Sequence, residues 1–443
     1  MLRVAVVGSG PSGVYTAQTL VERDPGVLVD VLDRLPCPYG LVRYGVAPDH
    51  EKIKSLQNNL RTVLEHERIR FLGGVQVGAR GVPAARLQEL YHAVVYCVGA
   101  ATDRHLGIPG EDLPGSWSAT RFVSWYSAHP DAVDDGFVRG ARSAVVIGVG
   151  NVAVDVTRIL ARGADELSPT DMPQAALSAL AASQVTDVHM VGRRGPSQAR
   201  FTTKELRELG TLPGAEVRVD PAELALDPAY TDPSELPAVP RRNVEVLRGW
   251  AALPPGEAPR RIRLRFFLRP VELLADGGRV GAVRFERTVP DGRGGVVGTG
   301  RFEEIEAQLV LRSVGYRGVP VEGLPFDEAT GTVPNDAGRV APGVYVAGWI
   351  KRGPTGVIGT NRPCAKETVM SLLEDAPVLA FADVPDDPLP ALRALGLAPV
   401  EWAGWQAIER AEAELGASLG RGVVKLPDWQ SLLTAAQAAD SAV

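Results

Sequence analysis

The sequence has 443 residues, of which 45% are hydrophobic and 23% are charged, which is ordinary for a globular protein of two or three domains. Its formal net charge of −6 argues against nucleic acid as the main partner. No apolar run is long enough to cross a membrane, and a strand pattern that starts at Leu2 leaves no room for a signal peptide. We therefore expect a cytoplasmic, monomeric protein that binds neither membrane nor nucleic acid.

The cysteines and histidines exclude several kinds of redox and metal site. Cys37, Cys97 and Cys364 lie far apart, and the sequence contains no C-x-x-C. A redox disulfide of that type and a cysteine-rich metal or iron–sulfur site are therefore not encoded. The histidines show no metal-ligand spacing, and we expect no metal.

The chain begins with a buried strand, a glycine turn and a helix pattern, and a second strand at 27–32 completes a βαβ unit. The turn holds Gly8, Gly10 and Gly13, which allow a tight turn, close approach of a pyrophosphate and close packing of helix on strand. Asp33 ends the second strand, where a carboxylate accepts hydrogen bonds from ribose hydroxyls. This pattern predicts a dinucleotide site, whereas the glycines alone are also compatible with a purely structural turn.

The same pattern restarts in the middle of the chain, after an expected helix at 51–65 and an expected strand at 93–98. Strand, glycine turn and helix recur over 141–160, with the fingerprint Gly148, Gly150 and Ala153. A helical insertion at 161–183 precedes a strand at 185–191, which ends in Arg193 and Arg194 instead of an acid. Arginines at that place favour a 2′-phosphate, hence NADP over NAD, although a solvated arginine pair is the competing interpretation.

The remaining segments give a coarser pattern. Residues 211–262 are rich in Pro, Asp and Arg and predict an irregular excursion, whereas 262–312 alternate as strands do. A strand at 343–349 runs into the glycine-rich stretch 347–361, A-G-W-I-K-R-G-P-T-G-V-I-G-T-N, and a helix is expected at 366–374. Residues 376–390 predict a linker, and 401–415 an amphipathic helix in an appendage.

These patterns predict an α/β protein with two Rossmann-like three-layer dinucleotide-binding domains. We expect a discontinuous FAD-binding domain at 1–105 and 320–375, an NADP-binding domain at 106–319, and a linker with a helical appendage at 376–443. The acid at the first site and the arginines at the second assign the flavin to the first and NADPH to the second. Because no C-x-x-C is present, the disulfide reductases are disfavoured and another electron acceptor is needed.

Several longer motifs resemble one family, the adrenodoxin-reductase-type ferredoxin–NADP reductases. They are V-V-G-S-G-P-S-G at 6–13, Y-G-L-V-R-Y-G-V-A-P-D-H at 39–50, G-N-V-A-V-D at 150–155, V-G-R-R-G-P at 191–196, F-T-T-K-E-L-R-E-L at 201–209 and G-W-I-K-R-G-P-T-G-V-I-G-T at 348–360. They occur in the family's order over residues 2–375, while 376–443 match more weakly.

The resemblance implies a flavoprotein oxidoreductase in which FAD takes a hydride from NADPH and passes single electrons to a ferredoxin, often for cytochrome P450 systems. It implies FAD contacts at Ser12, Asp33, Leu41, Val77, Trp349, Gly356, Val357 and Ile358. The implied NADP contacts are Arg104, Val149, Gly150, Asn151, Val152, Arg193, Arg194, Glu205 and Gly356. The chain departs from the family at two of these positions: Asp33 stands where Glu is frequent, and Val149 where a polar side chain is usual.

Hydride transfer between the two cofactors needs no nucleophile, because the protein has only to place the rings and exclude water. His50 is the candidate proton relay, with Glu208 as its partner, since the resemblance places both near the nicotinamide. A histidine satisfying hydrogen bonds at a domain interface is the competing interpretation. The glycine-rich stretch 347–361 is expected to hold backbone N–H groups against the flavin, at the place where the hydride crosses.

A ferredoxin partner is acidic, so we expect a basic docking face despite the negative net charge. Cations concentrate in two groups, the first being Arg193, Arg194, Arg200, Lys204 and Arg207, and the second Arg241, Arg242, Arg260, Arg261, Arg263 and Arg265. The second group is the candidate docking face, while some of these cations are expected to bind NADP or to be solvated. The alternatives are an NADPH-dependent flavin monooxygenase, a diaphorase without a ferredoxin, and a redox sensor that binds both nucleotides without rapid turnover. The monooxygenases carry a histidine-containing linker motif that this sequence lacks.

Overall fold

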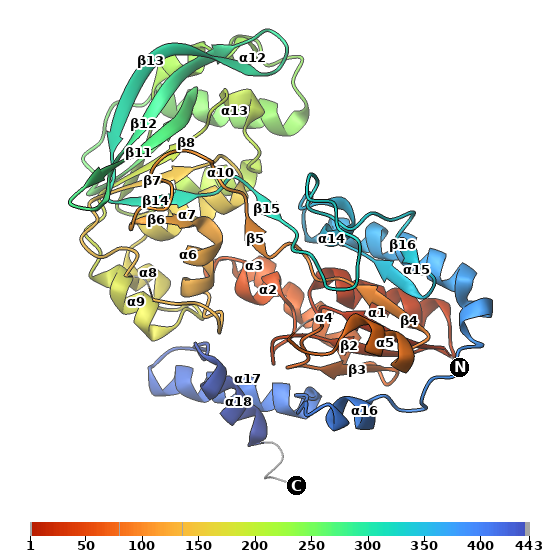
Figure 1. Ribbon diagram of the computed structural model, residues 1–443. Helices are drawn as coiled ribbons and strands as arrows, with labels where there is room; N and C mark the ends of the chain where they lie inside the picture. Colours follow the sequence, from red (N-terminus) through yellow and green to blue (C-terminus); the bar gives the residue numbers. More distant parts are fainter. Residues whose placement is uncertain (1, 79, 135, 439–443) are drawn as a thin grey trace. The chain divides into compact units, whose positions relative to one another are not determined.

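The computed structural model describes residues 2–78, 80–134 and 136–438. The chain divides into two compact units, each built on a parallel sheet (Figure 1). Unit 1 combines Met1–Thr102 with Gly315–Val443, and unit 2 is the intervening Asp103–Val314.

Unit 1 contains a sheet of six strands in the order β16-β17-β4-β1-β2-β3. The strands are β16 (Arg339–Ala341), β17 (Val344–Val346), β4 (Ala93–Tyr96), β1 (Arg3–Val7), β2 (Leu28–Leu32) and β3 (Ile69–Leu72). All pairs are parallel except β16 with β17, and Val4 of β1 is opposite Val29 of β2. The carboxyl ends of the five parallel strands therefore meet at one edge of the sheet.

Alternating side chains of β1 divide between two apolar layers, as expected for a parallel strand covered on both faces. Val4 and Val6 pack with α1 (Pro11–Arg23), α4 (Leu56–Leu64), α15 (Asn361–Leu379), α17 (Trp402–Ser418) and α18 (Trp429–Gln437). Ala5 and Val7 pack on the opposite face with α5 (Ala84–Leu90) and α16 (Leu389–Ala394). The result is a three-layer α/β arrangement.

Unit 2 contains a second sheet of six strands, all parallel, in the order β6-β14-β7-β8-β10-β9. The strands are β6 (Ser116–Ser118), β14 (Leu309–Arg312), β7 (Ser143–Ile147), β8 (Asp187–Val191), β10 (Arg260–Arg265) and β9 (Ala215–Val219). Ala144 and Val146 of β7 pack against a helical layer of α6 (Ala119–Tyr126), α7 (Asn151–Ala161), α9 (Gln174–Ala181), α10 (Thr203–Leu209) and α13 (Ala238–Ala251).

The other face of this sheet is covered by strands instead of helices. Val145 and Ile147 pack against an antiparallel sheet of β11 (Leu268–Asp276), β12 (Arg279–Pro290) and β13 (Val296–Glu306), which Figure 1 shows as the green ribbon of unit 2. The shorter elements of the two units are α2 (Leu41–Tyr44), α3 (Glu51–Lys54), β5 (Thr102–Asp103), α8 (Ala164–Leu167), α11 (Pro221–Ala225), α12 (Pro228–Thr231), β15 (Tyr316–Arg317) and α14 (Trp349–Arg352).

The predicted fold class is confirmed, but two local expectations were wrong. The segment 211–262 is not irregular, because it contains β9, α11, α12 and the long helix α13. The prediction was wrong because Pro221 and Pro228 each stand at the first position of a helix. The N–H that proline lacks has no partner within the helix at that position. The single helix expected at 51–65 is broken at Ser55, whose hydroxyl donates to the carbonyl of Lys52.

The segment expected to form an appendage packs closely within unit 1. Trp405 and Ile408 of α17 and Leu432 of α18 are almost completely buried, in the same apolar cluster as Val4 and Val6 of the central strand. The C-terminal helices therefore belong to the same apolar core as the strand that precedes the first glycine turn. None of the described helices is both long and apolar enough to span a bilayer.

Candidate dinucleotide sites

The first glycine loop connects β1 to α1 and can be built only with glycine at two positions. Gly8 has a φ of 109°, and an added Cβ would lie 2.5 Å from the carbonyl oxygen of Cys97. A Cβ on Gly13 would lie 1.8 Å from the carbonyl oxygen of Gly8. Helix α1 therefore starts directly against its strand, with its N-terminal N–H groups free to meet phosphate.

Asp33 follows β2, and the structure brings it to this loop. Its Oδ2 accepts hydrogen bonds from the backbone N–H and the hydroxyl of Ser9 at 2.8 and 2.5 Å, and its Oδ1 accepts from the N–H of Leu35 at 2.9 Å. Burial raises the pKa of the Asp33 carboxyl, although these hydrogen bonds oppose the shift. Because Oδ1 accepts only one of these bonds, it has a lone pair left for a ribose hydroxyl.

Other features of unit 1 fit a large, partly apolar dinucleotide such as FAD. The buried hydroxyl of Ser12, in the first turn of α1, has no hydrogen-bond partner among the described residues. Three apolar side chains from segments beside the carboxyl ends of the strands are exposed: Leu41 by 41%, Val98 by 36% and Val357 by 62%. A bound flavin nucleotide would accept the unused hydrogen bond at the helix N-terminus and would cover the exposed apolar side chains.

The remaining flavin candidates lie in the same unit. Trp349 begins α14 directly after β17, with its ring centroid 5.3 Å from that of Tyr316 and its indole N–H donating to the carbonyl of Thr355. Gly356 has a φ of 83° in the exposed loop that follows, and Ile358 is half-buried. Val77 is half-buried and bridges to Val82.

The second glycine loop connects β7 to α7 in unit 2. Gly148 has a φ of 140°, and an added Cβ would lie 2.1 Å from the carbonyl oxygen of Ser313, so the turn again requires glycine. A Cβ on Gly150 would meet nothing within 4 Å, which leaves open space where a pyrophosphate approaches. Val149 and Val152 are half-buried, and the Asn151 side chain accepts a hydrogen bond from the N–H of Thr202 at 2.8 Å.

Three arginines gather beside this loop. Arg193 and Arg194 follow β8, while the N–H of Arg200 donates to the carbonyl of Val149 at 2.8 Å. Burial lowers the pKa of the Arg194 guanidinium, and the positive charges of Arg193 and Arg200 lower it further. Among the described residues these three side chains make no ion pair. Mutually repelling, unneutralised arginines fit a phosphate such as the 2′-phosphate of NADP.

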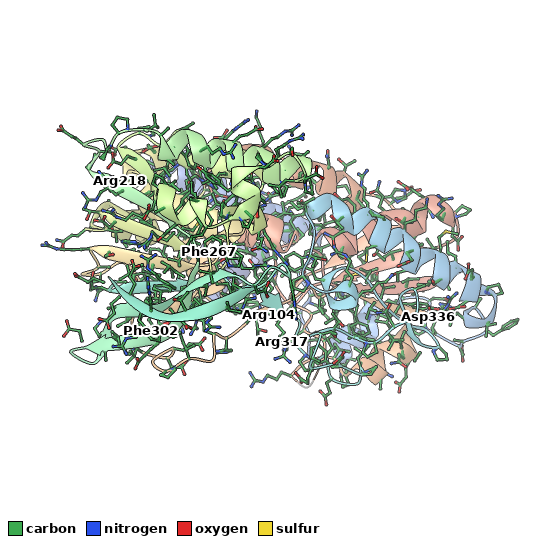
Figure 2. All side chains as sticks on the ribbon, turned by 90° about the horizontal axis from the view of Figure 1, so that it is seen from above. Arg104, Arg218, Phe267, Phe302, Arg317 and Asp336 are labelled. Carbon is green, nitrogen blue, oxygen red and sulfur yellow. The ribbon has the colours of Figure 1, made fainter. Side chains whose placement is uncertain are left out.

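The sequence pattern gives no specific role to Arg200, which the structure brings to the loop through its backbone bond to Val149 and its charge beside Arg194. The exposed Arg104, at the start of unit 2, is labelled in Figure 2. Within the described residues no hydrogen bond or ion pair ties its side chain to the arginine cluster, so its role stays a prediction.

The carboxylates of α10 are held by a buried arginine that the sequence did not suggest. Arg158 of α7 is fully buried, and its guanidinium lies 2.9 Å from Asp155, 3.7 Å from Glu205 and 3.4 Å from Glu208. Thr202 caps α10 by accepting from the N–H of Glu205 at 3.3 Å. Glu205 and Glu208 are thus brought together, whereas His50, which is buried at the N-terminus of α3, belongs to unit 1. The relay from His50 to Glu208 stays a prediction.

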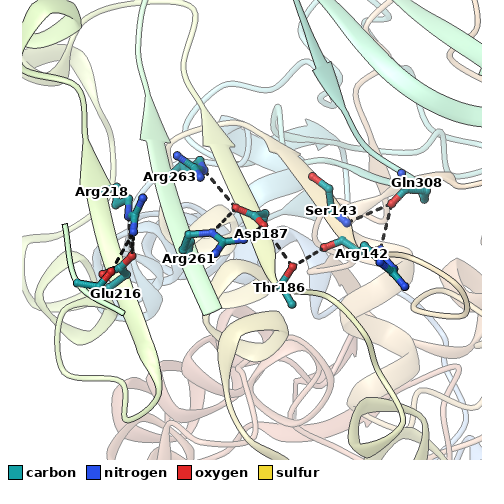
Figure 3. A network of polar contacts seen from close by, with 10 residues as sticks. Arg142, Ser143, Thr186, Asp187, Glu216, Arg218, Arg261, Arg263 and Gln308 are labelled. Atoms are coloured by element: carbon teal, nitrogen blue, oxygen red, sulfur yellow. Dashed lines mark hydrogen bonds and ion pairs between the residues drawn. The ribbon is translucent and has the colours of Figure 1, made fainter. Parts of the chain in front are cut away.

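Three of the four arginines of β10 are paired with acids within unit 2, contrary to their expected role as free docking cations, while Arg260 donates to the carbonyl of Ala161 at 3.3 Å. Figure 3 shows Asp187 accepting hydrogen bonds from Arg261 at 2.8 Å and from Arg263 at 3.2 Å, and these arginines lower the pKa of Asp187 to about 2. Arg265 pairs with Glu223 and Glu303.

Cations on α10 and α13 remain available instead. Arg207, Arg241 and Arg242 are exposed and, within the described part of the chain, make no ion pair. A cavity of about 600 Å³ lies beside them, lined by Thr203, Lys204, Arg207, Glu208, Thr211, Arg242 and Glu245.

Two glycine-loop sites in one chain, with an acid at one and arginines at the other, define a two-dinucleotide oxidoreductase. The model of the pyridine nucleotide-disulphide oxidoreductase family matches residues 2–210. NADPH-ferredoxin reductase FprA of Mycobacterium tuberculosis is 47% identical, over 97% of this chain and 98% of the relative. The mitochondrial NADPH:adrenodoxin oxidoreductase of Arabidopsis thaliana is 40% identical, over 98% of this chain and 95% of the relative.

Solved structures agree with these relatives. The complex of Mycobacterium tuberculosis FprA with NADPH superimposes with a TM-score of 0.93 at 44% identity, covering 98% of this chain and 99% of that one. The chain belongs to the adrenodoxin-reductase-type family of NADPH-ferredoxin reductases.

Proposed function

We propose that this protein is an NADPH-dependent flavoprotein reductase that delivers electrons to a ferredoxin. The observation that carries the proposal is the contrast between its two glycine loops, with Asp33 at the first and Arg193, Arg194 and Arg200 at the second. The acid suits FAD, which has no 2′-phosphate, and the arginines suit NADPH. The absence of C-x-x-C from the sequence leaves an external protein as the electron acceptor.

When bound, FAD accepts a hydride from NADPH and releases electrons singly to an iron–sulfur partner. Towards FAD, the chain supplies the glycine loop at Gly8, Gly10 and Gly13, the free hydroxyl of Ser12 and the carboxylate of Asp33. Trp349 would provide a ring for the flavin, and Gly356 and Ile358 would provide backbone N–H groups. The N–H of Val357 donates instead to the hydroxyl of Thr360 at 3.1 Å.

Towards NADPH, the open backbone at Gly150 and the N-terminus of α7 receive the pyrophosphate, and the arginines hold the 2′-phosphate. Arg158 holds Glu205 and Glu208 in position on α10, and we retain Glu205 as a proposed NADP contact. We retain His50 and Glu208 as the proposed proton relay.

We also propose that α10 and α13 form the ferredoxin-docking face, through Arg207, Arg241 and Arg242. The support is that these exposed cations are not neutralised within the described residues, unlike Arg261 and Arg263 of β10. Unpaired surface cations steer an acidic partner and raise its association rate, at the cost of strong salt dependence.

The direct test is NADPH-driven reduction of cytochrome c with and without each candidate ferredoxin of the source organism. We expect rapid flavin reduction by NADPH in a stopped-flow instrument and cytochrome c reduction that depends on ferredoxin. Substrate-coupled oxygen consumption without any ferredoxin effect would favour a monooxygenase, and slow flavin reduction would favour a sensor. A cytoplasmic, monomeric protein remains our proposal, which cell fractionation and light scattering test.

The docking face is tested by charge reversal at Arg241 and Arg242. The double change to Glu should raise the KM for ferredoxin on the order of tenfold at low salt and flatten its salt dependence, because rim charges act mainly on association. Arg301→Glu, at an exposed position on β13, is the matched control and should leave this KM unchanged. Equal effects of the two changes would contradict the docking face.

A further inference from the structure

The helix α2, Leu41–Tyr44, lies on the flavin side of unit 1 and is too short to hold its own conformation. It has four residues, whereas isolated helices need several turns to be stable in water. The two residues before it are in the left-handed region: Tyr39 has a φ of 81° and Gly40 a φ of 50°. A tyrosine rarely adopts this conformation, so surrounding contacts must hold it there.

This short helix presses on the first glycine loop. The N–H of Tyr39 donates to the carbonyl of Ser9 at 3.1 Å, and a Cβ on Gly40 would lie only 3.0 Å from the Cα of Gly10. Leu41, the proposed flavin contact, is the first residue of the helix. Any displacement of α2 is therefore transmitted to Gly10 and to Leu41.

The C-terminal segment holds α2 through Arg43, at both the side chain and the backbone. The Arg43 guanidinium pairs with Glu412 of α17 at 2.5 Å, and the two side chains are only 5% and 3% exposed. The guanidinium also lies over the ring of Trp405, 5.0 Å from its centroid. Lys425 donates from its Nζ to the carbonyl oxygen of Arg43 at 2.6 Å.

Glu412 is itself fixed from within the C-terminal segment. Its Oε1 also accepts the N–H of Leu426 at 3.0 Å, and its carbonyl accepts the N–H of Val424 at 3.1 Å. Trp405 completes the contact by meeting the strained Tyr39 edge-on, with 5.8 Å between ring centroids. Removing one partner of a buried ion pair leaves an uncompensated buried charge, so an arrangement of α2 that separated Arg43 from Glu412 would be strongly disfavoured.

We propose that the C-terminal segment 402–426 is a clamp that sets the flavin-binding conformation of Leu41–Tyr44, with Glu412 as the positioning residue and Lys425 as its second point of attachment. The inference rests on the proposed function, because the clamped helix matters only if FAD occupies the first glycine loop. It assigns a role in cofactor binding to a region whose sequence motifs gave none.

The test compares three variants of the full-length holoenzyme, each verified as folded by circular dichroism. Glu412→Gln keeps the shape and the bond from Leu426 but leaves the buried Arg43 charge unbalanced. Lys425→Met removes the bond to the Arg43 carbonyl and the contact of the ammonium with the Tyr44 ring, two contacts that the side chain makes with α2. Glu409→Gln is the matched control: Glu409 lies one turn away on α17 and pairs with Arg61 of α4 at 2.9 Å, and within the described part of the chain it makes no hydrogen bond or ion pair with α2.

The readouts are the dissociation constant of FAD, from the fluorescence of released flavin, and the absorption spectrum and midpoint potential of the bound flavin. We expect Glu412→Gln to raise the dissociation constant on the order of tenfold or more. Its flavin spectrum and potential should shift, with smaller changes of the same sign in Lys425→Met. Glu409→Gln should match the wild type in all three measurements.

The clamp is refuted if both Glu412→Gln and Lys425→Met bind FAD as the wild type does, with unchanged spectrum and potential. It is equally refuted if Glu409→Gln weakens FAD binding as much as Glu412→Gln, because the effect would then be general destabilisation. Should Glu412→Gln fail to fold, the comparison of Lys425→Met with Glu409→Gln decides. A wild-type protein without FAD would instead overturn the proposed function.

Discussion

Replacing Arg194 with Gln should selectively weaken NADPH binding at the second dinucleotide site and so reduce its preference for NADPH over NADH. Arg194 is the half-buried member of the arginine cluster, so its charge acts on a bound phosphate with less screening than that of the exposed Arg193 or Arg200. Glutamine keeps most of the side-chain length and one amide donor but loses the charge.

The magnitude follows from the bonds lost and the repulsion relieved. A hydrogen bond between charged groups contributes about 1.5–3 kcal/mol, which corresponds to about 10- to 150-fold in an equilibrium constant. Arg193 and Arg200 lower the pKa of Arg194, which shows that the three charges repel each other, and removing one relieves part of that cost. We therefore expect the KM for NADPH to rise by about 10- to 50-fold, towards the lower end of the range.

The assay is steady-state reduction of ferricyanide with NADPH and with NADH as donors. NADH is the internal control, because it lacks the 2′-phosphate and its KM should change less than about twofold. Arg200→Gln should show the same selectivity with a smaller effect, since Arg200 is exposed. An equal rise in both KM values, or an unchanged KM for NADPH, would show that the arginine cluster does not bind the 2′-phosphate.

Three further predictions concern other parts of the molecule. Gly356→Val adds a Cβ 2.6 Å from the Thr360 hydroxyl, at a φ of 83°. FAD should stay bound in this variant, while reduction of the flavin by NADPH in a stopped-flow instrument should slow about 100-fold. In the control Gly359→Ala the added Cβ meets nothing within 4 Å, and the flavin should be reduced at the normal rate. Trp405→Ala empties a site that is 1% exposed and should lower the free energy of unfolding by about 3–5 kcal/mol in a denaturant titration; an unchanged midpoint would mean that α17 is not part of the core. Burial lowers the pKa of His189 to about 4, and the positive charges of Arg263 and Arg265 contribute to the shift. Between pH 6.5 and 4 the unfolded chain therefore binds more protons than the folded one, and the free energy of unfolding falls as the pH falls through that window. His189→Gln should remove about 2 kcal/mol of this acid destabilisation in denaturation curves at pH 7 and pH 4.5; parallel losses in both proteins would exclude His189 as the cause.

The two dinucleotide loops were predictable because their determinants are local. Gly8 and Gly148 sit at turns that a strand, a few residues and a helix define, and both have a positive φ that favours glycine. The clash of an added Cβ is local only at Gly13, which would meet the carbonyl of Gly8, whereas Gly8 and Gly148 would meet carbonyls of segments distant in the sequence. Asp33 and the pair Arg193 and Arg194 follow the next strand of each unit, and parallel strands of a sheet carry such residues to the same edge.

Contacts between segments distant in the sequence were not predictable in the same way. Arg158 carried no signal of its role, because the carboxylates of Glu205 and Glu208 reach it only once α7 and α10 pack together. The prolines of 211–262 were interpreted as marks of irregular chain, although they begin helices that tertiary packing stabilises. Nothing in the sequence pairs the arginines of β10 with an acid, yet Asp187 of the neighbouring strand neutralises two of them.

The sequence alone determined the fold class, the two nucleotide loops and the family, because short-range glycine geometry and the charge at each strand end specify them. The tertiary structure alone decided which charges are paired and where the C-terminal segment lies. Arg43 and Glu412 are separated by 369 positions, and only the folded core around Trp405 brings them to 2.5 Å. Local steric rules act within a few residues, whereas burial and ion pairing depend on which surfaces the whole chain brings together.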